Sequence, residues 1–246
     1  MNDVVIVTGA ASGIGRAVAE VVLARSATVG VLLIDQNADG VHEAAATLGD
    51  RATALACDVT DQKAVSATVS SAIDGDRLIG LVNAAGNHRA KPSLELSPDD
   101  WHSVLDVHLD GTLYPSQAAA RLMIATGGGS IVNFSSVAAS FGWPNRLAYS
   151  VAKAAIGALT RTLAVEWAEY AIRVNAVAPG YVNTPMIRRA AEEGVIDAEA
   201  IAERHAVKRF AEPSEIAEVV EFLLSERASF MTGEVVTVDG GFSAKR

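Results

Sequence analysis

Short runs of β-branched and other apolar residues alternate along the chain with longer stretches in which apolar residues recur at helical spacing. Most of the short runs are too continuously apolar for strands with one face in water, and they fit buried parallel strands. The seven candidate strands cover 4–8, 29–34, 53–57, 78–83, 130–134, 173–176 and 234–238. The helical stretches between them include 14–24, 62–73, 98–125, 149–170 and 213–224.

This alternation predicts an α/β fold: a doubly wound sandwich of Rossmann type, with about seven parallel strands and helices on both faces. No repeat or linker interrupts it, so we expect one domain over 1–246. Segment 186–212 departs from the alternation, because it is dense in charged residues and adds no strand. It is a candidate substrate lid, and a solvated surface hairpin fits it equally well.

One helical stretch, 149–170, carries an apolar residue at every fourth position. A stripe of this spacing predicts that one face of the helix packs against the sheet. The residues of the stripe are Val151, Ala155, Leu159, Leu163 and Trp167.

Composition narrows the class of protein. Half of the 246 residues are hydrophobic and a fifth are charged, which argues against disorder. No apolar run approaches the roughly 18 residues of a membrane helix, and the N-terminus has no basic leader, so we expect a cytoplasmic protein. One cysteine, Cys57, allows no internal disulfide and suggests no metal site. A net charge of −9 disfavours nucleic acid, and a small-molecule partner fits better.

The first strand runs directly into a glycine-rich turn and then a helix. Gly9, Gly13 and Gly15 follow the pattern G-x-x-x-G-x-G within Thr8–Gly15. Glycines at such a turn let a pyrophosphate approach the free amides at the helix N-terminus. The pattern therefore indicates a dinucleotide site, although glycines are also common in turns without one.

Two aspartates follow the next two strands. Asp35 stands where a dinucleotide fold presents a carboxylate to the ribose hydroxyls of adenosine, and this carboxylate would repel a 2′-phosphate. NAD(H) is therefore the expected cofactor rather than NADP(H). A helix-capping aspartate is the alternative for Asp35. Asp58 either bonds the adenine amino group or serves as a cap or turn former.

Tyr149 and Lys153 lie four residues apart on a strongly periodic helix, so their side chains share one face. A free tyrosine has a pKa of about 10 and is a poor proton shuttle at neutral pH. A nearby cation lowers the pKa of the phenol, which then serves as a general acid or base. A tyrosine and a lysine at this spacing are also common on ordinary exposed helices.

With these motifs in order, the chain resembles the classical short-chain dehydrogenase/reductases over essentially its full length. The motifs that carry the resemblance are Thr8–Gly15, Asp58, Asn83-Ala84-Ala85-Gly86, Ser135-Ser136, Tyr149 with Lys153, and Pro179-Gly180. The resemblance implies that Ser136 bonds the substrate oxygen, that Tyr149 exchanges the proton and that Lys153 holds the nicotinamide ribose. It also implies a homotetramer. The cofactor-binding residues that we expect are Gly9, Ser12, Gly13, Ile14, Gly15, Asp35, Asp58, Val59, Asn83, Ala84, Gly86, Tyr149, Lys153, Pro179, Gly180, Val182 and Thr184.

His108 departs from the family, which usually has an asparagine at this position. The resemblance implies that the main-chain carbonyl at this position holds a water on the proton path of the lysine. A histidine keeps that carbonyl, but its ring is larger and titrates near neutral pH. His108 is therefore a candidate catalytic residue, and a histidine satisfied by packing is the alternative.

These residues predict an NAD(H)-dependent oxidoreductase that interconverts a secondary alcohol and a ketone. A 3-oxoacyl thioester (acyl-carrier-protein) reductase is the main alternative, although Asp35 and the net negative charge speak against it. A non-catalytic dinucleotide-binding or redox-sensing protein is the second alternative. The expected pocket mouth mixes aromatic and polar side chains and fits a compact, partly apolar substrate. Its residues are Asn87, His88, Phe141, Trp143, Tyr181 and Met186.

Overall fold

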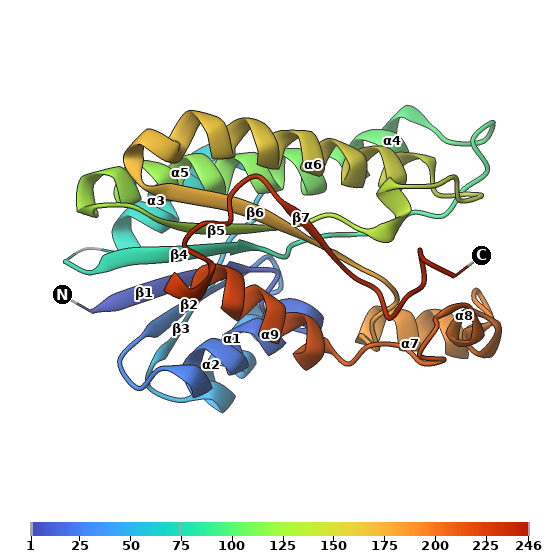
Figure 1. Cartoon of the computed structure of the whole chain (residues 1–246), viewed down its shortest axis with the longest axis horizontal. Coiled ribbons are helices and arrows are strands. Elements are labelled where there is room, and N and C mark those ends of the chain that lie inside the picture. The colour runs from blue at the N-terminus through green and yellow to red at the C-terminus, as the bar shows by residue number, and fades with distance from the viewer. Residues whose placement is uncertain (1, 74, 246) are drawn as a thin grey trace.

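In the computed structural model, which describes residues 2–73 and 75–245, a seven-stranded parallel sheet forms the centre of the molecule (Figure 1). Met1, Asp74 and Arg246, three positions of the domain expected over 1–246, lie outside the described residues. The strands stand in the order β3-β2-β1-β4-β5-β6-β7. They are β1 (Asp3–Thr8), β2 (Gly30–Asp35), β3 (Ala52–Ala56), β4 (Arg77–Asn83), β5 (Gly129–Phe134), β6 (Ile172–Pro179) and β7 (Val235–Val238).

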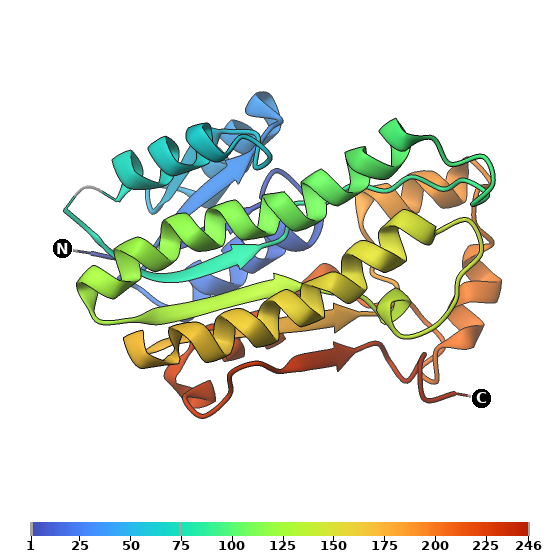
Figure 2. The ribbon, with the colours of Figure 1, turned by 90° about the horizontal axis from the view of Figure 1, so that it is seen from above.

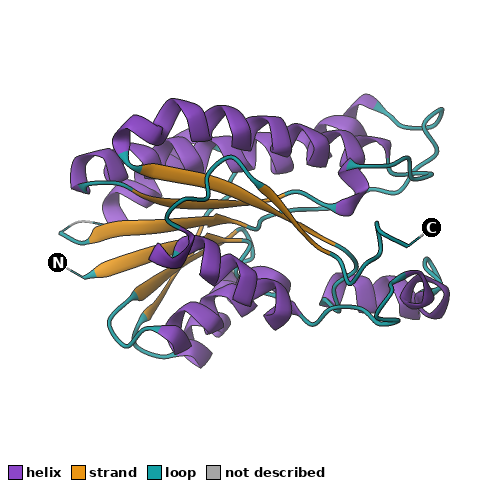
Figure 3. Cartoon of the chain, viewed as in Figure 1, coloured by secondary structure: helices purple, strands orange, loops and turns teal. Residues whose placement is uncertain are grey.

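Helices cover both faces of the sheet (Figures 1 and 3). On one face lie α1 (Gly13–Arg25), α2 (Ala38–Leu48) and α9 (Pro213–Leu224). On the other lie α3 (Gln62–Ala72), α5 (Gly111–Thr126) and α6 (Leu147–Trp167). The remaining helices, α4 (Pro98–Leu105), α7 (Pro185–Glu192) and α8 (Ala198–Arg204), gather at the end of the sheet where the strands finish.

Alternation of side chains along the central strands explains the two layers. Val7 and Leu33 point into the core beneath α1 and α9, whereas Ile6 and Leu32 point into the core beneath α5 and α6. All four are nearly inaccessible to water. Strands buried on both faces are continuously apolar, which is why the sequence pattern locates them, and the predicted doubly wound fold is confirmed.

Several helices differ from the sequence-based expectation. The stretch 98–125 is helical throughout but is not one regular α-helix, because a π-helical segment, Asp106–Asp110, joins α4 to α5. The sequence analysis did not single out α2 as a helix. Segment 186–212 does contain two short helices and no strand, as expected, with α7 beginning one residue earlier at Pro185.

The predicted apolar stripe on α6 is confirmed toward the C-terminal end of the helix and wrong at its start. Leu163 is buried, and Leu159 and Trp167 pack against the same core. Val151, the first member, is exposed, and the helix buries Ala152 and Ile156 there instead. The reason is geometric: residues four apart advance about 40° beyond a full turn, so a long i+4 stripe winds around the helix. Small apolar residues lie on several sides of α6, and spacing alone did not select the face that meets the sheet.

No helix in the described part of the chain, residues 2–73 and 75–245, combines the length and the apolar character needed to cross a lipid bilayer. Seen from above, α5 and α6 run side by side over the sheet, and α7 and α8 lie beyond its strand ends (Figure 2). The space between these layers is where the predicted functional residues meet.

Candidate active site

One large cavity opens at the carboxyl ends of the strands. β1 and β4 are neighbours in the sheet, but the chain winds away from them in opposite directions, so a crevice forms where the following segments separate. The cavity has a volume of about 550 Å³ and extends from the glycine turn after β1 to α7 and the turn that follows it.

Nearly all of the residues predicted from the sequence meet in this cavity. Those that line it are Gly9, Ser12, Gly13, Ile14, Gly15, Asp35, Asp58, Val59, Ala84, Gly86, His108, Ser136, Tyr149, Lys153, Pro179, Gly180, Val182 and Thr184. Of the expected mouth residues, Phe141 lies outside the lining and packs against Trp143, with 5.8 Å between the ring centroids.

The glycine turn fits an anionic group at the N-terminus of α1. Gly9 has a φ of 65°, and a Cβ there would lie 2.7 Å from the carbonyl oxygen of Ala84. A Cβ at Gly15 would lie 2.4 Å from the carbonyl oxygen of Gly9. Among the described residues, the N-cap Ser12 makes no side-chain cap hydrogen bond. The first amides of α1 therefore face the cavity without a side-chain acceptor, as a pyrophosphate site requires.

Asp35 and Asp58 line the cavity at the same end. The Asp35 carboxylate accepts backbone N–H groups from Ala11 at 3.1 Å and from Asn37 at 2.9 Å. Asn37, not Asp35, caps α2, so the capping alternative for Asp35 is wrong. Asp58 accepts two hydrogen bonds from Thr60, so it does form the turn that one alternative predicted.

At the opposite end, β5 and α6 bring Ser136, Tyr149 and Lys153 together. Ser136 follows β5, and its Oγ accepts the Ala138 N–H at 3.1 Å, which leaves the hydroxyl proton for another partner. Lys153 lies one turn after Tyr149, with its Nζ 5.6 Å from the centroid of the phenol ring. Ser135, in contrast, donates to the carbonyl oxygen of Lys153 at 2.9 Å and has a structural role.

Burial, rather than the neighbouring cation, controls the titration of this pair. The Lys153 side chain is buried and donates to the Phe134 carbonyl oxygen at 2.7 Å, and burial lowers the pKa of Lys153 to about 7. Burial also raises the pKa of Tyr149, while the Ser136 hydroxyl and the Arg146 guanidinium act to lower it. The expectation that Lys153 depresses the pKa of Tyr149 is not met in this structure, because its ammonium group bonds a carbonyl and is itself partly neutral.

His108 lies in the π-helical segment, beneath the phenol. Its ring packs edge-on against Tyr149, with 5.4 Å between centroids, and Nε2 is 2.9 Å from the Asn87 carbonyl oxygen. Because a carbonyl only accepts, Nε2 carries the proton. A Cβ at Gly86 would lie 2.7 Å from Cε1 of His108, so the imidazole occupies space that only a glycine leaves open.

Burial, reinforced by Lys153, lowers the pKa of His108 to about 3, so the imidazole is neutral at physiological pH. The main-chain carbonyl of His108 accepts the Thr112 hydroxyl at 2.7 Å. The backbone role that the resemblance implies therefore needs no charged imidazole.

Asn83 does not line the cavity. Its side-chain amide is buried and donates to Ser116 Oγ and to Asn133 Oδ1, both at 2.9 Å. Asn133 in turn donates to Thr160 Oγ1 at 3.0 Å. Asn83 therefore holds the ends of β4 and β5 together, and its neighbours Ala84, Ala85 and Gly86 face the cavity.

The helices after β6 are fixed to the cavity wall through His205. Its Nδ1 lies 3.0 Å from the Ile201 carbonyl oxygen, and its Nε2 accepts the Tyr181 N–H at 3.3 Å. The guanidinium of Arg204 packs over the ring of Phe242 at 4.5 Å. These contacts place Ile187, Ala190, Val195 and Ile196 along the cavity.

Arg146 is a site residue that the sequence pattern did not predict. Arg146 lines the cavity just before α6, three residues from Tyr149, and its Nη1 hydrogen-bonds Nε2 of His88. The ring of His88 packs edge-on against Tyr149 at 5.4 Å. Burial and Arg146 lower the pKa of His88 to about 4. The spacing of one helical turn before Tyr149 was a signal that could have identified Arg146.

Comparison with known proteins finds relatives that match this chain over nearly its whole length. A family model described as enoyl-(acyl carrier protein) reductase matches residues 9–243. Cis-4-hydroxycyclohexanecarboxylate dehydrogenase of Sinomonas cyclohexanicum is 41% identical, over 98% of this chain and 96% of its own length. D-threitol dehydrogenase of Mycolicibacterium smegmatis is 38% identical, over 99% and 94%. A solved NAD(P)-dependent gluconate 5-dehydrogenase from Beutenbergia cavernae, with NADP bound at low occupancy, is 37% identical with a TM-score of 0.90, over 98% and 97%.

The buried imidazole of His108 predicts a specific pH dependence. Its pKa is about 3 in the folded protein and about 6.5 when unfolded, so below pH 6.5 the unfolded chain takes up a proton that the folded chain does not. The free energy of unfolding should therefore decrease as the pH is lowered through this range. The slope of this decrease should be smaller in His108→Asn, by up to about 1 kcal/mol per pH unit. Chemical denaturation from pH 7 to 4 measures this difference.

The same substitution tests the proton path. The pH profile of turnover of the unmodified protein should show no titration of His108 between pH 5 and pH 9. His108→Asn should change turnover little, since the backbone carbonyl remains. A limb near pH 6.5 that vanishes in the asparagine variant would show that the imidazole itself transfers protons.

Proposed function

Because the chain belongs to the classical short-chain dehydrogenase/reductase family, we propose that it is an NAD(H)-dependent oxidoreductase that interconverts a secondary alcohol and a ketone. One observation carries the proposal: a single cavity joins the glycine turn and Asp35 at one end to Ser136, Tyr149 and Lys153 at the other. A dinucleotide and a small substrate would meet within it. The named activities of its relatives, on a cyclic alcohol and on a polyol, support the substrate class.

Residues of this chain divide the binding of the dinucleotide among them. The amides of Gly13 to Gly15 are available for the pyrophosphate, and the Asp35 carboxylate is available for the ribose hydroxyls of adenosine. Pro179, Gly180 and Thr184 line the same cavity and would contact the nicotinamide end. When bound, the nicotinamide accepts or supplies the hydride.

Proton transfer falls to the tyrosine. In the direction of oxidation, Tyr149 as phenolate removes the proton of the substrate hydroxyl, and in reduction its phenol returns that proton to the ketone oxygen. The Ser136 hydroxyl is free to donate to the same oxygen and to hold it in place. Lys153, whose pKa is about 7, is suited both to accept and to release a proton near neutral pH.

A 3-oxoacyl-carrier-protein reductase remains the second candidate, because a reductase of that name from Thermotoga maritima is 36% identical over 98% of this chain. This chain has exposed positive charge around the lid segment, at Arg188, Arg189 and Lys208, that would attract an acidic carrier protein. Asp35 speaks against the phosphorylated cofactor that such reductases commonly use. A non-catalytic dinucleotide-binding protein has no need of Ser136, Tyr149 and Lys153 in one cavity.

One assay separates these candidates. The protein is incubated with NAD and a panel of cyclic and aliphatic secondary alcohols, and the absorbance of reduced nicotinamide is followed. Oxidation of free alcohols supports the proposal. Activity only with NADPH and a 3-oxoacyl thioester supports the second candidate, and dinucleotide binding without turnover of any substrate supports a non-catalytic role.

Replacing Tyr149 with phenylalanine tests the mechanism. The change removes the proton-transferring hydroxyl and keeps the ring, so we expect kcat/KM to fall by about a thousandfold. The affinity for NAD should be nearly unchanged in calorimetry, because the glycine turn and Asp35 are intact. Turnover close to that of the unmodified protein would refute proton transfer by Tyr149.

The Asp35 carboxylate should set the choice of cofactor. Repulsion of the 2′-phosphate predicts a preference for NAD over NADP of roughly 100-fold in kcat/KM. Asp35→Ser combined with Gln36→Arg removes the repulsion and adds a cation, which should narrow the preference. Steady-state kinetics with both cofactors measure it, and an unmodified protein that prefers NADP would contradict our interpretation of this strand end.

We also propose that the chain assembles as a homotetramer. The outer face of α6 exposes Leu147, Val151 and Val165, and the Val165 side chain is 80% exposed in the single chain. An apolar helix face of this kind is typical of a surface covered by another subunit. Light scattering should give a mass four times that of one chain, and Val165→Glu should lower it, whereas a monomeric unmodified protein would contradict the proposal.

A further inference from the structure

Within residues 2–73 and 75–245, Arg146 is a cation at the substrate end of the cavity that has no anionic partner. It is half-buried, and the neutral ring of His88 is the only hydrogen-bond partner of its side chain among these residues. It takes part in none of the ion pairs formed by those residues. A guanidinium has five N–H donors in a planar fork that matches a carboxylate, so most of this capacity is unused.

Charge is divided unevenly along the cavity. The acidic residues in its lining, Asp35 and Asp58, both lie at the adenosine end. Arg146 and Lys153 lie at the catalytic end, where none of the described residues contributes a carboxylate to the wall. The protein as a whole carries a net charge of −9, so this positive end is a local feature. The pyrophosphate of a dinucleotide does not account for it, because the glycine turn that fits the pyrophosphate is at the other end.

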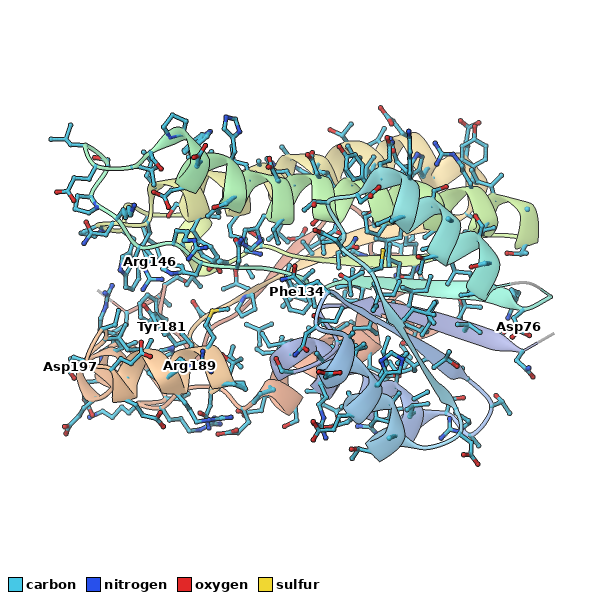
Figure 4. All side chains as sticks on the ribbon, turned by 180° about the vertical axis from the view of Figure 1, so that it is seen from behind. Asp76, Phe134, Arg146, Tyr181, Arg189 and Asp197 are labelled. Carbon is cyan, nitrogen blue, oxygen red and sulfur yellow. The ribbon has the colours of Figure 1, made fainter. Side chains whose placement is uncertain are left out.

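His88 fixes the position of the guanidinium relative to the phenol. Its Nε2 accepts from Arg146, which requires that Nε2 carries no proton, and its pKa of about 4 keeps the ring neutral. The same ring packs against Tyr149. Arg146 is therefore held one imidazole ring away from the phenol, and Figure 4 shows it across from the lid helix that carries Arg189, with Tyr181 between them.

Apolar side chains surround the space beside these two groups. Trp143 and Tyr181 line one part of the wall, and Met186, Ile187 and Ile196 of the lid segment line another. Walls of this kind fit a compact hydrocarbon ring or short chain, and a cation among them selects a ligand with one anionic group.

We propose that the substrate is a hydroxy or oxo carboxylate whose carboxylate is bound by Arg146 while its alcohol or ketone oxygen meets Tyr149 and Ser136. The inference rests on the proposed function for the reaction itself. The neutral imidazole of His88 orients the guanidinium, and the anion restores the pairing that a half-buried cation otherwise lacks. Arg146 thus sets specificity by its charge and is neither the donor nor the acceptor of the transferred proton.

A matched pair of substrates tests the proposal. A 4-hydroxycyclohexanecarboxylate and the corresponding carboxamide differ in charge and hardly in shape. We expect the carboxylate to be preferred, and Arg146→Gln to raise its KM roughly tenfold to a hundredfold. The same variant should change the KM of the carboxamide little, because glutamine still donates hydrogen bonds, and any change in kcat from the lost charge near Tyr149 should be the same for both substrates.

Two further variants separate charge from structure. Arg146→Lys keeps the charge without the planar fork and should recover part of the carboxylate preference. Arg189→Gln removes a positive charge from an exposed position on α7 outside the cavity lining and should keep the full preference. A purely structural role of Arg146 would instead raise the KM of both substrates equally in Arg146→Gln, and that result would overturn the proposal.

Equilibrium binding makes the test independent of turnover. Cyclohexanecarboxylate and cyclohexanecarboxamide, which cannot react, are titrated calorimetrically into the protein saturated with NAD. Tighter binding of the carboxylate that is lost in Arg146→Gln supports the proposal even if no alcohol is oxidised, in which case only the proposed function fails. Equal binding of the two compounds, or a preference that survives in Arg146→Gln, overturns the proposal even if alcohols are oxidised.

Discussion

The change of winding direction between β1 and β4 is the constraint on which the site depends. The two strands pair directly, from Asp3 with Arg77 to Thr8 with Asn83, yet the chain leaves them toward opposite faces of the sheet. Beyond the last pair the backbones stay so close that Gly9 has no room for a Cβ against Ala84. The crevice opens immediately beyond this contact. The N-terminus of α1 and the catalytic end of α6 consequently face one cavity, although more than 130 residues separate Gly13 from Tyr149.

Buried polar groups hold the catalytic end in place behind this crevice. Hydrogen bonds run from Thr160 through Asn133 and Asn83 to Ser116, and so connect α6 with β5, β4 and α5. Ser116 donates to the Thr112 carbonyl oxygen at 2.6 Å, and the Thr112 hydroxyl donates to that of His108. Buried polar groups are costly when unpaired, so each member restrains its neighbour. The carbonyl of His108 and the helix that bears Tyr149 are thus positioned by one connected network.

The sequence predicted what depends on local pattern and missed what depends on packing. Parallel strands buried on both faces are apolar throughout, so β1 and β2 could be located within one residue. The glycine turn and the Tyr149–Lys153 spacing are likewise local. The buried face of α6 and the π-helical turn at His108 are not, because they follow from how neighbouring elements pack. The pKa of Tyr149 is raised rather than lowered for the same reason. Burial is a tertiary property, and the spacing of residues along the chain does not predict it.

Desolvation also sets which side chains of the cavity are charged. Burial shifts Tyr149, Lys153, His88 and His108 toward their neutral forms. Tyrosine, lysine and histidine respond in this way because they can gain or lose a proton, and near neutral pH Lys153 is thereby poised to do so. A guanidinium does not lose its charge in a protein, so Arg146 stays cationic amid neutral neighbours. The uncharged surroundings screen the charge of the Arg146 guanidinium only weakly. An anion between the lid segment and Tyr149 would therefore be attracted more strongly than in water.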